Sequence, residues 1–152
     1  MNVHIDSQSG ELIAEGYFFG PQLTESEFLQ SPVGRTAKKV SSKGTRVYYD
    51  VWLSVGDGRE FGATLGFLPG NRLERINLKL VPVEAKKLPW SKERESEIKQ
   101  FHDEWILTEL GRDPHEFGWG TVLSIVEPHW SSAIVRIDYS RRQGSRPSDS
   151  VR

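Results

Sequence analysis

Apolar and polar residues alternate along much of the middle and the end of the chain. In residues 47–55 the apolar positions are Val47, Tyr49, Val51, Leu53 and Val55, and the positions between them are polar or aromatic. A period of two is typical of a strand with one buried face. The same alternation recurs in three further segments, residues 61–67, 76–80 and 133–139. We therefore predict an antiparallel meander in the middle of the chain and a hairpin at its end, with Asp57-Gly58 as one of the turns.

The N-terminal third gives different patterns. Residues 1–10 are polar and predict no regular structure, whereas residues 11–20 are rich in aromatic and branched side chains and predict a single first strand. A short helix over about 25–30 follows. Thr24 can cap its first turn and Glu27 can complete a capping box. The Ser31-Pro32 step predicts the end of this helix.

One long helix is predicted over about 92–110, with Ser91 as its N-cap and Gly111 just after its last turn. At about 100° per residue, Ile98, Phe101 and Trp105 fall on one stripe, which should face the sheet. His102 lies beside this stripe. We expect it to be partly buried where the helix meets the sheet.

These elements predict an α+β fold. Residues 1–140 form a single domain with an antiparallel sheet of about five to seven strands, the long helix on one face, and the short helix near the start. Residues 141–152 contain four arginines, one aspartate and few apolar side chains. This composition predicts a disordered basic tail.

Composition restricts the function classes further. The 152 residues are 36% hydrophobic and 27% charged, with a net charge of −1 and no cysteine. Disulfides, thiolate metal sites and cysteine nucleophiles are thereby excluded. The sequence has neither an apolar run of about 20 residues nor a secretory signal, so we expect a cytoplasmic protein without a membrane partner. No motif predicts a cofactor.

Histidines and carboxylates gather in the last third of the chain. His102, His115 and His129 lie there with Glu116 and Glu127. On the helix, however, the residues three and four positions from His102 cannot bind a metal, so no helical metal motif is present. We predict no catalytic or metal-binding residue. The alternative is a small enzyme or a ligand- or metal-binding domain, which would require these side chains to converge in the fold.

Aromatic residues stand next to a basic stretch. No acidic residue occurs between Phe28 and Tyr49, while Lys38, Lys39 and Arg46 lie there among other basic residues; Tyr48 and Trp52 share the second face of their predicted strand. Aromatic and charged side chains of this kind are typical of protein interfaces, so these five residues are our candidate contact patch for an acidic protein partner. The alternative is a solvated hairpin whose aromatics are covered by the short helix or by the linker before the long helix. Because the body of the chain is net acidic and carries no RNA-recognition motif, we expect no nucleic-acid partner.

The segment "FHDEWILTELG", followed by "FGWGTVLSIVEPHWSSAIVRIDY", carries a resemblance. A helix that ends in a tryptophan-containing segment, followed by Trp-Gly at the start of a C-terminal hairpin, resembles small bacterial immunity proteins encoded beside secreted or contact-delivered toxins. The resemblance covers about 40 residues. It implies a non-enzymatic protein that binds and occludes one cognate toxin, through contact residues that differ from pair to pair.

Overall fold

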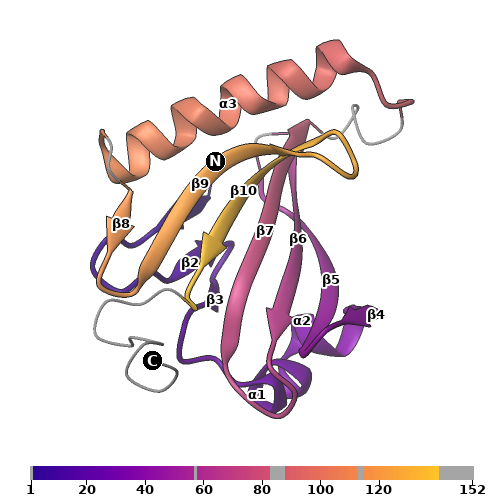
Figure 1. The fold of residues 1–152 in the computed structure, drawn as a ribbon, viewed down its shortest axis with the longest axis vertical. Helices are drawn as coiled ribbons and strands as arrows, with labels where there is room; N and C mark the ends of the chain where they lie inside the picture. Colours follow the sequence, from indigo (N-terminus) through magenta and orange to yellow (C-terminus); the bar gives the residue numbers. More distant parts are fainter. Residues whose placement is uncertain (1, 57, 83–87, 113–114, 141–152) are drawn as a thin grey trace.

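The computed structural model describes residues 2–56, 58–82, 88–112 and 115–140, and these form the predicted α+β fold (Figure 1). One sheet has seven strands in the order β4-β5-β6-β7-β10-β9-β8, and a smaller sheet has the order β1-β2-β3. The neighbouring strands of both sheets are antiparallel. The strands are β1 (Val3–Ile5), β2 (Leu12–Ala14), β3 (Tyr17–Phe19), β4 (Lys38–Lys43), β5 (Arg46–Ser54), β6 (Arg59–Phe67), β7 (Leu73–Pro82), β8 (Glu116–Phe117), β9 (Gly120–Glu127) and β10 (Ser132–Asp138); the helices are α1 (Glu25–Gln30), α2 (Pro32–Thr36) and α3 (Lys92–Leu110).

The domain limits at 1–140 stay a prediction, and the expected basic tail at 141–152 lies outside the described residues. Within the part of the chain that the structure describes, no helix is long and apolar enough to cross a membrane.

The N-terminal segment differs from the prediction. Residues 3–5 form strand β1, which pairs with β2, and residues 11–20 form the hairpin β2–β3 instead of one strand. The turn consists of Glu15 and Gly16, whose φ angles are 49° and 85°. Two residues with positive φ are typical of a tight hairpin turn that follows the twist of its strands. Strands of three residues are too short to show a period of two, which explains why the sequence did not reveal them.

The capping box of α1 is confirmed. The Thr24 hydroxyl accepts a hydrogen bond from the Glu27 amide at 3.1 Å, and the Glu27 carboxylate accepts one from the Thr24 amide at 3.0 Å. Helix α1 ends at Gln30 as expected, but Ser31 then caps a second helix, α2, with Pro32 in its first turn. The Ser31-Pro32 step therefore ends α1, as predicted, and also begins α2, which was not predicted. Proline is equally suited to the first position of a new helix, because no hydrogen bond from its nitrogen is needed there.

The core lies between the seven-stranded sheet and a second layer made of α3 and the small sheet. Phe19 of β3 stacks on Phe61 of β6, with ring centroids 6.1 Å apart. The Trp105 indole donates to the Val3 carbonyl at 3.1 Å, which ties α3 to β1. Figure 1 shows α3 across one end of the large sheet and α1 and α2 at the other end. The inner face of the large sheet, which these elements cover, bears the buried residues Val47, Tyr49, Val51, Phe61, Ala63, Leu65, Phe67, Ile76, Leu78, Leu80, Val135 and Ile137.

Helix α3 completes the large sheet where two of its central strands cease to pair. Paired residues of β7 and β10 run only from Asp138 opposite Arg75 to Val135 opposite Leu78, although both strands continue beyond this point. There the Leu80 amide donates to Nε2 of His102 at 3.0 Å, and the Ala133 amide donates to Oε1 of Glu95 at 2.9 Å. Side chains of α3 thus supply the acceptors that a neighbouring strand would otherwise provide.

Removal of the Glu95 carboxylate should destabilise the fold. The Glu95→Ala substitution leaves the buried Ala133 amide without its acceptor, at a cost of about 1 to 3 kcal/mol in the free energy of unfolding. Glu95→Gln keeps a carbonyl oxygen and should cost less. The exposed residue Glu97 on the same helix provides the control, since Glu97→Ala should change stability by less than about 0.5 kcal/mol. Urea denaturation measures all three, and equal losses for Glu95→Ala and Glu97→Ala would contradict the assigned role.

Candidate protein-binding surface

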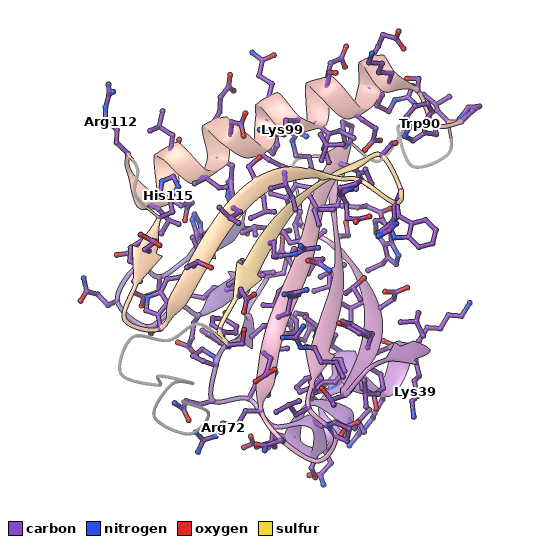
Figure 2. The ribbon with its side chains drawn as sticks, viewed as in Figure 1. Lys39, Arg72, Trp90, Lys99, Arg112 and His115 are labelled. Atoms are coloured by element: carbon purple, nitrogen blue, oxygen red, sulfur yellow. The ribbon has the colours of Figure 1, made fainter. Side chains whose placement is uncertain are left out.

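The three histidines of the alternative enzyme or metal site do not come together. His102 is fully buried on the side of α3 that faces the sheet, whereas His129 lies in the exposed turn between β9 and β10. His115 lies beside the last turn of α3, where its ring hydrogen-bonds the Gly111 carbonyl (Figure 2). The His115 carbonyl accepts from Val122 of β9, and the rise of a strand from there to Glu127 places His129 roughly 17 Å away. Among the described residues, no group of three or more histidine or carboxylate side chains could hold a metal ion.

His102 is buried more deeply than the sequence predicted. Burial, and secondly the positive charge of Lys79, lower the pKa of the His102 imidazole to about 3. The ring is therefore neutral near pH 7. Because Nε2 accepts from Leu80, the proton must reside on Nδ1, which has no hydrogen-bond partner. His102 is thus a structural acceptor.

The burial of His102 makes stability depend on pH. The unfolded chain binds a proton at this imidazole below about pH 6.5, whereas the folded chain does so only near pH 3. The free energy of unfolding should therefore fall as the pH drops below 6.5, by about 2 kcal/mol at pH 5 from this group. His102→Gln retains an acceptor that does not titrate. Urea denaturation between pH 7.5 and 5 should give a shallower pH dependence for this variant than for the wild type, and parallel curves would contradict the proposed titration.

The face of the large sheet opposite the core is the candidate surface. We call it the outer face. Trp52 is 49% exposed and Leu123 54% exposed on it, so neither residue is covered by α1, α2 or the described part of the linker. The outer face is defined by the side chains of Tyr48, Asp50, Trp52, Thr64, Asn77, Leu123 and Arg136, which come from five neighbouring strands.

The two aromatic residues of the outer face pack against two glycines of β6. Gly62 stands opposite Trp52, and Gly66 stands opposite Tyr48. A Cβ atom at Gly62 would lie 2.6 Å from the Trp52 ring, and one at Gly66 would lie 2.8 Å from the Tyr48 ring. The Trp52 and Tyr48 rings therefore pack directly against the backbone of the two glycines. The sequence did show these glycines on one strand face, but their pairing with the aromatic residues depends on the register of β5 and β6.

A side chain at Gly62 should displace the Trp52 ring. We expect Gly62→Ala to lower the free energy of unfolding by about 1 to 3 kcal/mol, because overpacking forces the ring from its position. The loss should be smaller when Trp52 is also replaced by alanine, and the double-mutant cycle measures this difference by urea denaturation. An equal loss in both backgrounds would show that Trp52 does not depend on the glycine.

The structure divides the candidate contact patch. Lys38 stands opposite Asp50 in the strand register at the edge of the outer face, and Nε of Arg46 donates a hydrogen bond to Glu74 there at 3.3 Å. These residues lie beside Tyr48 and Trp52. Lys39 instead stands opposite Tyr49, whose side chain points into the core, so Lys39 belongs to the other face of β4. Figure 2 shows Lys39 at β4, the edge strand of the large sheet.

A row of polar residues crosses the middle of the outer face, and of its members only Lys38 was a candidate from the sequence. The polar residues at this level of adjacent strands are Lys38, Asp50, Thr64, Asn77 and Arg136, and the apolar Leu123 of β9 stands next to Arg136. Within the row, Thr64 donates to Asp50 at 2.7 Å, and Nε of Arg136 donates to the Asn77 side-chain oxygen at 2.9 Å. Each of these residues occupies an ordinary polar position in a strand with alternating polar and apolar residues. No signal in the sequence therefore distinguishes the row.

Comparison with known proteins supports the fold. No protein-family model and no curated protein matches the chain. Among solved structures, the chain is similar to one in the structure described as "Rhs1-CT in complex with cognate immunity protein RhsI1". The TM-score is 0.59 at 14% sequence identity, over 98% of this chain and 92% of that chain. At this identity the similarity is one of fold, and the structure that shares it contains an immunity protein bound to Rhs1-CT.

Proposed function

We propose that this chain is an immunity-type protein, which binds one cognate toxin and blocks it without catalysing a reaction. The observation that carries the proposal is the fold shared, over nearly the whole length, with a chain from a complex that contains a cognate immunity protein. The sequence resemblance to immunity proteins favours the immunity member of that complex. A protein with this role would act in the bacterial cytoplasm, before the toxin reaches its target.

The outer face supports a mechanism of occlusion. Trp52 and Tyr48 present large rings at little cost in entropy, since the rings already pack against the two glycines. Lys38 and Arg46 border these rings, so the surface suits a partner that brings acidic groups. We propose Tyr48, Trp52, Lys38 and Arg46 as contact residues. Lys39, on the opposite strand face, no longer belongs to this proposed surface.

Co-expression tests the function. The product of the open reading frame that adjoins this gene should arrest growth of a sensitive host when expressed alone, and growth should return when this chain is expressed with it. The purified proteins should form a stable complex. This chain expressed alone should not harm the host. Growth arrest by this chain alone, or failure to bind the adjoining product, would overturn the proposal.

The contact residues can be tested in the same complex. We expect Trp52→Ala to weaken binding by about 2 kcal/mol or more, roughly 30-fold, because a central aromatic side chain is a typical hot spot. Lys38→Ala should weaken binding less, since it lies at the rim. Lys39→Ala provides the matched control and should leave the dissociation constant unchanged. Calorimetric titration measures all three, and unchanged affinity for Trp52→Ala would remove the outer face from the interface.

A further inference from the structure

Arg136 ends the polar row on β10, between Asn77 of β7 and Leu123 of β9, and lacks a carboxylate partner among the described residues. Its side chain is half-buried, and Nε donates to Asn77 at 2.9 Å. Among the described residues, its guanidinium forms no ion pair and no further hydrogen bond. Because Nε is engaged, the edge formed by the two terminal nitrogens remains free. That edge can donate two parallel hydrogen bonds to one carboxylate.

The nearby carboxylates are already engaged by other groups. Asp138, two residues along β10, accepts from Arg75 at 3.0 Å and from Ser140. Glu127 accepts the backbone amides of His129 and Trp130 in the turn after β9. The carboxylate of Asp50 lies in the same polar row as Arg136, but it accepts from Thr64.

Asp50 is also too distant to neutralise Arg136. Three strand spacings separate β5 from β10, or roughly 14 Å, which exceeds the range of effective attraction between exposed charges in physiological salt. No carboxylate of the outer face therefore pairs with Arg136.

The surroundings of Arg136 also disfavour its isolated charge. Burial, and secondly the repulsion by Arg75, lower the pKa of the Arg136 guanidinium from its ordinary value. Glu127 and Asp138 act in the opposite direction but do not outweigh these effects. A partner carboxylate would relieve this cost. The exposed Leu123 side chain on the neighbouring strand could then help to exclude water from the pair.

We propose that Arg136, oriented by Asn77, binds an aspartate or glutamate side chain of the cognate toxin at the β10 strand of the outer face. This assignment rests on the proposed function and names the chemistry of one contact. The hydrogen bond to Asn77 orients the Arg136 guanidinium. The site should therefore select a carboxylate that approaches the outer face between the aromatic residues of β5 and strand β9.

Titration of variants against the product of the adjoining open reading frame tests the assignment. Arg136→Gln should weaken binding roughly 30-fold or more, the usual effect when one member of a buried charge pair is truncated. Arg136→Lys should also weaken binding, because an ammonium group cannot donate in the same two-pronged geometry. Arg72 lies at the far end of β7 (Figure 2) and is exposed. Arg72→Gln is the matched control and should bind like the wild type.

A second variant separates binding from a merely structural role. Asn77→Asp places a carboxylate of this chain beside Arg136, where it would compete with that of the toxin. We expect this variant to fold at least as stably as the wild type, by urea denaturation, and yet to bind the toxin more weakly. On the toxin, a single acidic-to-amide substitution should weaken binding to the wild type but not to Arg136→Gln, which identifies the partner carboxylate.

The outcomes distinguish the two proposals. If the toxin is bound and neutralised while Arg136→Gln and Asn77→Asp bind as tightly as the wild type, the role of Arg136 is overturned and the proposed function stands. If the wild-type chain binds no product of the adjoining frame, the proposed function fails, and the assignment of Arg136 fails with it. Binding of a labelled oligonucleotide that depends on Arg136 would assign the surface to phosphate and would also overturn the proposal.

Discussion

The insertion of α3 at the point where β7 and β10 separate is the constraint on which the rest of the structure depends. Two strands that diverge in the middle of a sheet expose amides that must find other acceptors. His102 and Glu95 provide them, for Leu80 and Ala133 respectively. The same helix then reaches the small sheet through Trp105. Because α3 contacts both layers, the two sheets share one core, and no helix or strand of the described residues covers the outer face of the large sheet.

That outer face connects the fold to the proposed function. The hydrophobic core requires only one face of the large sheet, so the other face can carry side chains selected for contact. Glycines at two positions of β6 let the aromatic rings of β5 pack against the backbone, and the hydrogen bond to Asn77 in the polar row orients Arg136. Both features reduce the entropy that a partner must overcome when it binds. The outer face thus combines aromatic rings packed on glycines with paired polar side chains, and its Arg136 cation is paired with an amide instead of a carboxylate.

Much of the fold could be predicted from local patterns, and the failures have physical reasons. Residues close together in the sequence predict the capping box at Thr24 and Glu27, the long helix after Ser91 and the alternating strands. The structure confirms all three. Strand β1 and the turn at Glu15-Gly16 were missed, because three-residue strands carry too little periodicity to be recognised. The binding role of the candidate residues stays a prediction, but the structure confirms that Tyr48 and Trp52 share one strand face. Arg136 was not a candidate, because its significance depends on which carboxylates its neighbours already engage.

The order of residues along the chain was sufficient to establish an α+β domain, the main helix and strand positions and the faces of the longest strands. These features depend on residues that are close together in the sequence, so they can be predicted without the tertiary structure. The assembled structure was needed to show that His102 is an internal acceptor, that Lys39 lies on the opposite face of the sheet from Tyr48, and that Arg136 has no acidic partner among the described residues. Each of these facts depends on strand register and on burial, which bring together residues that are far apart in the chain.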